Sequence, residues 1–296
     1  MEKEALPRLD TAPGIREALL PCCRLKKGEI WEDPVKGHRV GVLDAAVLTD
    51  VERIMGGEKA ACIINDPPYN LKVGGKSSRQ LSRRALDTYM DFSRAWVINA
   101  AAVLAENSHL YVWLGADQND GFQPLPDFMI MMRGFPDLQA RSFITVRNQR
   151  GYGTQKNWMA VRQELLYYVK GSPPFTAVYT DIPKVLKGYY KSVGGVLTEN
   201  IERSRSPNIR PGNVWLDIQQ VFYRMEENVP GAYAQKPLKA LERILLASSA
   251  PAELVADFFA HAGTTLLACE KLGRRCVTFD LDPLYAELSI RRLEHF

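Results

Sequence analysis

The feature that most constrains the fold is the regular alternation near the C-terminus. Two short apolar runs, residues 253–258 and 276–280, alternate with two amphipathic stretches, residues 264–272 and 283–293. Apolar runs bounded by turn residues predict buried strands, and apolar residues at helical spacing predict helices. Strands and helices in strict alternation with short turns are typical of parallel strands joined by crossover helices. The sequence therefore predicts an α/β protein with a mostly parallel sheet.

The first part of the chain repeats this alternation less regularly. Strands are predicted at residues 60–65, 109–114, 141–147 and 164–169, and helices at residues 88–104 and 237–248. Residues 171–232 are irregular and rich in Gly, Pro, Ser and Asn, which interrupt regular structure. We expect one sheet encoded in two blocks of sequence, with an irregular insert between them.

Composition excludes several classes of protein. The chain has 296 residues, of which 46% are hydrophobic and 24% charged, which is ordinary for a globular protein. Its longest uncharged apolar runs, such as residues 96–105, are too short to span a membrane. The N-terminus carries acidic residues and lacks the apolar segment of a secretory signal. The five cysteines form no CxxC pair, so we expect a cytoplasmic protein with reduced thiols, no metal site and no membrane partner.

The first chemical motif is Asp66-Pro67-Pro68-Tyr69, which follows the predicted strand 60–65. Two successive prolines end the strand and fix the backbone. The Asp66 carboxylate and the Pro67 carbonyl are then two acceptors in one geometry, which suits an amino group with two N–H donors. The ring of Tyr69 offers a flat face to a planar base. An ordinary turn at the end of a strand remains the alternative interpretation.

The second motif follows the predicted strand 253–258. Asp257 ends that strand, Phe259 and Gly263 lie in the turn, and Thr264 and Thr265 open the next helix. The following strand ends in Asp280, 23 residues after Asp257. A tight turn at a helix N-terminus, followed by a carboxylate for ribose hydroxyls, is typical of a nucleoside-cofactor site. His261 stands where a GxGxxG motif has its first glycine, so a cofactor without a pyrophosphate is favoured. A generic strand-to-helix turn is the alternative.

Together, the two motifs resemble those of the amino-group DNA methyltransferases. These enzymes transfer a methyl group from S-adenosylmethionine to adenine N6 or cytosine N4. The catalytic motif comes first here, and an insert separates it from the cofactor motif, as in the circularly permuted beta group. Gln235-Lys236-Pro237 resembles the family's QKP element, and Leu43-Asp44 resembles a Gly-Asp element near the cofactor adenine. The resemblance covers residues 38–296 and departs from the family pattern at His261, a glycine in the family.

The resemblance implies a fold, a domain organisation and a chemistry. The fold is a Rossmann-like, circularly permuted, mostly parallel sheet. Residues 1–170 would be the catalytic half, residues 171–232 the target-recognition insert, and residues 233–296 the cofactor-binding half of the same domain. The target base would be rotated out of the duplex, and the methyl group would transfer by direct in-line displacement.

The resemblance also implies site residues. Asp66 and the carbonyl of Pro67 would hold the target amino group, Pro68 would fix the turn, and Tyr69 would stack on the base. The residues implied to form the S-adenosylmethionine site are Asp44, Gln235, Lys236, Asp257, Phe259, Gly263, Thr264, Thr265 and Asp280.

Two windows without acidic residues follow the catalytic motif in the chain. Residues 71–86 and 138–163 carry five basic residues each, so the rest of the chain has a net charge of −6 (4 − 10). Such windows favour contact with DNA phosphates, and a solvated face is the alternative. The polar and aromatic residues of the second window, Trp158 among them, can read base edges or stack. The predicted DNA-binding residues are Lys72, Lys76, Arg79, Arg83, Arg84, Arg147, Arg150 and Lys156.

The substrate and the partners stay partly open. The aspartate of the catalytic motif favours adenine, because serine is commoner in cytosine N4 enzymes of the family. Cytosine N4 methylation, an RNA or protein methyltransferase, and a non-catalytic DNA-binding relative are the alternatives. The expected partner is double-stranded DNA in a prokaryotic or phage setting. A homodimer and a separate restriction endonuclease are left open as further partners.

Overall fold

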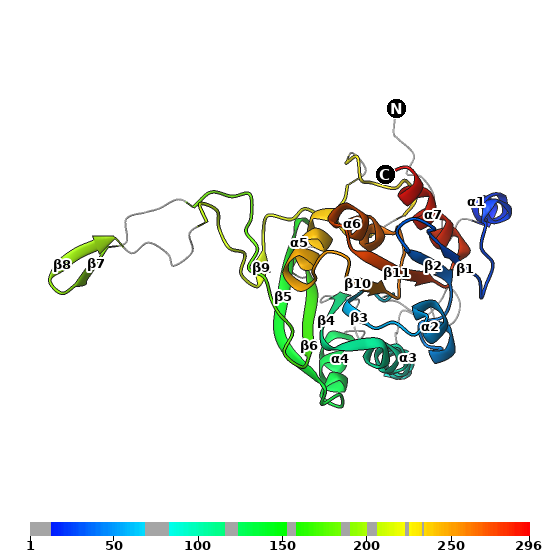
Figure 1. The fold of residues 1–296 in the computed structure, drawn as a ribbon, viewed down its shortest axis with the longest axis horizontal. Helices are drawn as coiled ribbons and strands as arrows, with labels where there is room; N and C mark the ends of the chain where they lie inside the picture. Colours follow the sequence, from blue (N-terminus) through cyan, green and yellow to red (C-terminus); the bar gives the residue numbers. More distant parts are fainter. Residues whose placement is uncertain are drawn as a thin grey trace.

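A nine-stranded sheet forms the centre of the part of the chain that the structure describes (Figure 1). The structure is a computed structural model, and it describes residues 13–68, 83–115, 124–152, 158–184, 190–199, 206–222, 225–232 and 234–296. The strand order is β1-β2-β11-β10-β3-β4-β6-β5-β9. The strands are β1 (Ile30–Glu32), β2 (Arg39–Val42), β3 (Ala60–Asn65), β4 (Leu104–Gly115), β5 (Leu138–Tyr152), β6 (Ala160–Lys170), β9 (Val214–Trp215), β10 (Leu254–Asp257) and β11 (Arg275–Asp280).

The sheet is mostly parallel, which confirms the predicted fold class. The strands β2, β11, β10, β3 and β4 run parallel to one another, whereas β6 is antiparallel to β4 and to β5. The register sets Val255 of β10 beside Cys62 of β3. The C-terminal strand β10 is therefore the neighbour of β3 from the first half of the chain. The two predicted motifs follow the carboxyl ends of these neighbouring parallel strands, so they lie at the same edge of the sheet.

Helices cover both faces of the sheet and form three layers (Figure 1). One face packs against α2 (Leu48–Met55), α3 (Arg83–Val103) and α4 (Pro124–Met132), and the other against α5 (Leu238–Ser248), α6 (Thr264–Leu272) and α7 (Pro283–Glu294). Successive strand residues point to opposite faces, so Ile63 packs in the first core and Ile64 in the second. A strand buried on both faces is mostly apolar, which accounts for the apolar run from Ala60 to Ile64 in β3.

Several elements differ from the sequence-based expectation. Helix α3 begins at Arg83, five residues before the predicted start, and β4, β5 and β6 are all longer than predicted. The insert is not uniformly irregular, because it contains the hairpin β7 (Tyr190–Val193) and β8 (Val196–Glu199) and the short strand β9. Figure 1 shows the β7–β8 hairpin projecting away from the sheet, while β9 extends the sheet beside β5. Pairing with a neighbour's backbone is a tertiary effect that composition does not reveal.

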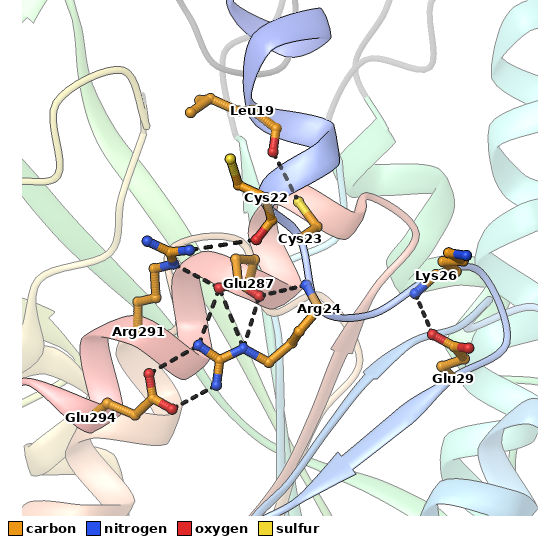
Figure 2. Close-up of polar contacts among 9 residues, drawn as sticks. All are labelled: Leu19, Cys22, Cys23, Arg24, Lys26, Glu29, Glu287, Arg291 and Glu294. Atoms are coloured by element: carbon orange, nitrogen blue, oxygen red, sulfur yellow. Dashed lines mark hydrogen bonds and ion pairs between the residues drawn. The ribbon is translucent and has the colours of Figure 1, made fainter.

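The N-terminal segment is anchored to α7 by charged side chains. It forms α1 (Pro13–Leu19) and a short 3₁₀ turn (Leu20–Cys22). Figure 2 shows the Arg24 guanidinium between two carboxylates, with Nε 3.1 Å from Glu287 Oε2 and Nη1 2.6 Å from Glu294 Oε1. Arg291 pairs with the same Glu287 and donates to the Cys22 carbonyl. Among the described residues, no helix has the length and apolar character needed to cross a membrane.

Candidate active site

The two predicted motifs meet at the carboxyl ends of β3 and β10. Asn65, the last residue of β3, is fully buried, and its Oδ1 accepts the N–H of Phe258 at 3.0 Å. This hydrogen bond joins the strand that carries Asp66 to the loop that follows Asp257. Asn65 was not among the predicted site residues. The one signal for it is a polar residue that closes an otherwise apolar strand, because a buried amide needs partners.

A pocket opens at this edge of the sheet. It is lined by Ile64, Asp66, Trp113, Lys236, Leu241, Asp257, Phe259, Ala260, His261, Ala262, Thr264 and Thr265. Six of the predicted site residues are among them, and they come from both blocks of the sequence. The wall also contains Trp113 of β4 and Leu241 of α5, which lie in a predicted strand and a predicted helix and were not among the predicted site residues. Apolar residues in a strand or helix carry no signal that separates a pocket wall from a core position.

Asp66 is held by an ion pair inside the pocket. Its Oδ2 lies 2.5 Å from the ammonium nitrogen Nζ of Lys236, and the two side chains are 23% and 7% exposed. The same ammonium lies 5.3 Å from the ring centroid of Trp113, within the range of a cation–π contact. Pro67 is buried and Pro68 is exposed. Tyr69 lies outside the described residues.

Asp257 lies in a drier part of the same pocket. It is 5% exposed, and its Oδ1 accepts the N–H of Phe259 at 2.9 Å. Burial raises the pKa of Asp257 to about 7 against the opposing hydrogen bonds from Thr265 and Phe259, and the charges of Asp66 and Asp280 add to the rise. A cation bound at this carboxylate would lower that pKa and gain from the low dielectric. The pocket therefore has one carboxylate with a lysine partner and one held by hydrogen bonds.

Two residues of the turn after β10, His261 and Gly263, have left-handed backbone conformations. Gly263 has φ of +69°, and a Cβ atom there would lie 2.9 Å from the Ser289 Cα atom and 2.7 Å from its Oγ. His261 has φ of +44°, also in the left-handed region that favours glycine. The departure from the family pattern thus falls where glycine is conformationally preferred. His261 adopts the conformation, donates its N–H to Asp280 Oδ2 at 3.1 Å, and places its ring 4.7 Å from that of Tyr285.

The remaining predicted cofactor residues lie beside the pocket and are not part of its wall. Asp280 ends β11, and burial raises its pKa to about 6. The Leu43 N–H donates to the Asp280 carbonyl at 3.0 Å, which sets Asp44 next to that strand end. Gln235 donates its amide to the Glu227 carbonyl at 2.7 Å and accepts the N–H of Val229 at 3.1 Å. Its side chain is thus engaged with the chain's own backbone.

The structure describes only part of the predicted DNA-binding set. Arg147 is exposed on β5 and lies opposite Arg162 of β6. Strand β4 ends at Gly115, opposite Gln163, so this arginine pair lies just beyond the end of β4. Lys72, Lys76, Arg79 and Lys156 fall outside the described residues, as do the side chains of Arg83, Arg84 and Arg150.

Comparisons with known proteins find DNA methyltransferases that match most of the chain. A family model for DNA methylases of the N6 and N4 type matches residues 60–291. The chain is 28% identical over 233 residues to the type II methyltransferase M.HpaI of Haemophilus parainfluenzae, covering 78% of this chain and 67% of that protein. It is 26% identical over 270 residues to the DNA adenine methyltransferase YhdJ of Escherichia coli K12, covering 86% of this chain and 82% of YhdJ.

Solved structures support the fold. The cytosine-N4-specific PvuII DNA methyltransferase matches with a TM-score of 0.61 and 16% identity, covering 91% of this chain and 89% of that one. The complex of M1.HpyAVI with SAM matches with a TM-score of 0.56 and 17% identity, covering 84% and 96%. The family model covers most of the chain, including both halves of the pocket. The chain therefore belongs to the N6/N4 DNA methylase family.

Proposed function

We propose that this protein transfers a methyl group from S-adenosylmethionine to adenine N6 in duplex DNA. One observation carries the proposal: Asp66, on a proline-fixed turn, and Asp257, in a dry recess, line one pocket at adjacent strand ends. A target amino group and a cationic methyl donor need two such neighbouring sites. Among the similar proteins, M1.HpyAVI was solved as a complex with SAM, and YhdJ is a DNA adenine methyltransferase.

The residues of the pocket fit the proposed cofactor. S-Adenosylmethionine is a cation with a ribose and a planar base, and when bound it supplies a methyl group activated on a sulfonium. Asp257 offers a buried carboxylate that a bound cation would keep ionised, and Phe259 and Leu241 offer apolar contact. Asp280 would accept hydrogen bonds from ribose hydroxyls, and Asp44 would lie near the base. Gly263 lets the turn that carries the pocket residues pack directly against Ser289 of α7.

The chain's own residues would bind and align the target amino group. The Asp66 carboxylate and the Pro67 carbonyl would accept its two N–H donors, which draws the nitrogen towards a tetrahedral shape and frees its lone pair. Trp113 and Phe259 would exclude water from this part of the pocket. Alignment and desolvation would supply most of the rate enhancement. We propose that the ring of Tyr69 stacks on the flipped base.

The β5–β6 hairpin is the proposed contact with duplex DNA. Its end projects beyond β4, at the sheet edge that carries the pocket. Arg147 and Arg162 are cross-strand partners there, and Arg162 also pairs with Glu164 at 3.2 Å. Arg147 is exposed beside them and can contact a DNA phosphate. Trp158, close to this pair in the chain, is 93% exposed. The acid-free windows and the insert 171–232 would complete the interface, with the insert as the recognition region.

Mass spectrometry of nucleosides tests the proposal. Duplex DNA is incubated with the protein and S-adenosylmethionine and then digested, and we expect N6-methyladenine. N4-methylcytosine would replace the adenine assignment, and the similarity to the PvuII enzyme makes this the second candidate. Equal or stronger labelling of RNA would overturn duplex DNA as the substrate. A homodimer and a separate endonuclease remain predictions that size measurements and pull-down can check.

A further inference from the structure

Lys236 lies at the target side of the pocket. The family resemblance assigns this lysine to the cofactor site, but its ammonium contacts Asp66 at 2.5 Å. The hydrogen bonds assigned to Asp257 come from Phe259 and Thr265, so the two carboxylates are held by different groups. The lysine therefore neutralises the carboxylate that would hold the target amino group.

The backbone around Lys236 is fixed on both sides. Gln235 is held by its two hydrogen bonds to the backbone at Glu227 and Val229. Pro237 has φ of −69° and caps the start of α5. The lysine side chain is 7% exposed and extends past the Trp113 ring to Asp66. Because the backbone of Lys236 is fixed and its ammonium is buried, the ion pair restricts the positions that the Asp66 carboxylate can take.

We propose that Lys236 is a positioning residue, which acts through Asp66 on the target amino group and is not a ligand of the cofactor. This inference rests on the proposed function. Replacing Lys236 by a neutral residue removes a positive charge from beside the Asp66 carboxylate, at the wall of a pocket that receives a cation. Affinity for a cationic ligand should then stay the same or increase, whereas alignment of the target amine should worsen.

Two probes separate the alternatives in Lys236→Gln. S-Adenosylmethionine carries a sulfonium charge, and S-adenosylhomocysteine is the matching neutral thioether. By calorimetry, we expect the preference for the charged probe over the neutral one to rise several-fold. In single-turnover assays at saturating cofactor, we expect the rate constant of methyl transfer to fall by about 10- to 100-fold, the scale of a misplaced reacting group. Lys236→Arg should recover part of that rate.

The neighbouring Lys239 is the matched control. It lies on α5, is about half exposed, and pairs with Asp181 outside the pocket. Lys239→Gln should leave both ligand affinities and the transfer rate unchanged. If Lys236→Gln folds poorly in a thermal melt, Lys236→Met keeps most of the side-chain length and its apolar packing while it removes the charge and the hydrogen bond to Asp66. In an Asp66→Asn background, the further fall in transfer rate on replacing Lys236 should largely disappear, because the lysine acts on the target amine through the Asp66 carboxylate.

The outcomes are distinct. A weaker affinity for S-adenosylmethionine in Lys236→Gln, with an unchanged rate at saturation, would identify Lys236 as a cofactor ligand and overturn the inference. Unchanged rate and unchanged affinities would also overturn it. Failure of the wild-type protein to methylate any duplex DNA would instead contradict the proposed function itself.

Discussion

Two aspartates at neighbouring strand ends have opposite environments. Asp66, after β3, faces the ammonium of Lys236, just before α5, and keeps 23% of its side chain exposed. Asp257, at the end of β10, is 5% exposed and is held by a backbone N–H and the Thr265 side chain. The first carboxylate has its countercharge supplied by the chain. The second is held at a pKa of about 7 by burial.

This difference allows one pocket to bind two ligands, each beside a different carboxylate. A cation gains most beside a buried carboxylate that has hydrogen-bond donors but no ion-pair partner, which is the state of Asp257 among the described residues. A neutral amino group needs acceptors in a fixed geometry, which the Asp66 turn offers. We therefore assign the methyl donor and the target base to different carboxylates, and each variant below breaks or sharpens that assignment.

The largest expected effect is the loss of methyl transfer in Asp66→Ala. Removing the main acceptor for the target amine should lower the single-turnover rate constant by about a thousandfold or more, the upper range for loss of one electrostatic contact. Tritium transfer to DNA measures it, and a thermal melt checks that the protein is folded. Activity within tenfold of wild type would remove Asp66 from the mechanism.

Gly263→Ala should damage the cofactor side. Its new Cβ atom would meet Ser289 at under 3 Å, and φ of +69° is unfavourable for alanine. We expect a loss of about 2–4 kcal/mol in the free energy of unfolding, together with weaker cofactor binding. Gly273→Ala is the control, because Gly273 has the same φ of +69° with nothing within 4 Å of its Cβ position. Equal losses in the two variants would show that the contact with Ser289 is unimportant.

The pH dependence should follow Asp257. Its pKa is raised to about 7 in the folded protein, so the folded state holds a proton that the unfolded state releases near pH 4. The free energy of unfolding should therefore fall as pH rises from about 4 to about 7. Affinity for the cationic cofactor should rise several-fold between about pH 6 and about pH 8, as the carboxylate becomes charged.

Asp257→Asn supplies the control for both pH trends. The slope of stability should flatten, with the residual slope due to Asp280, whose pKa is raised to about 6 by burial. The pH dependence of cofactor affinity should largely vanish. Identical profiles for the variant and the wild type would exclude Asp257 as the titrating group.

The smallest expected effect is a gain in stability from His261→Gly. Glycine removes the left-handed strain at φ of +44° but also loses the ring contact with Tyr285 and adds chain entropy to the unfolded state. We expect a net gain of about 0.5 kcal/mol in denaturant titrations. Ala252→Gly, at φ of +66° and without an aromatic ring to lose, should gain slightly more. A loss above about 1 kcal/mol in His261→Gly would mean that the imidazole contributes more than its backbone costs.

The sequence predicted the fold well where apolar pattern and turn chemistry act locally. The strand–helix–strand–helix unit and the prolines after β3 are such cases, and their elements form as expected. Asn65 and Trp113 were not predicted as site residues, because their roles depend on which strands become neighbours. The ion pair between Lys236 and Asp66 spans 170 positions, and no local pattern encodes it. The sequence shows that His261 departs from the family pattern, but only the structure shows that its backbone has a left-handed φ of +44°.

Cofactor affinity measured by calorimetry in Asp66→Ala and Asp257→Ala tests the division between the two carboxylates most directly. We predict that Asp66→Ala, which removes the carboxylate partner of Lys236, binds S-adenosylmethionine at most several-fold more weakly than wild type, while its methyl transfer is lost. Asp257→Ala should lose most of its affinity for the cofactor. Equal losses of affinity in the two folded variants, or a larger loss in Asp66→Ala, would contradict the assignment of the target amine to Asp66 and the methyl donor to Asp257.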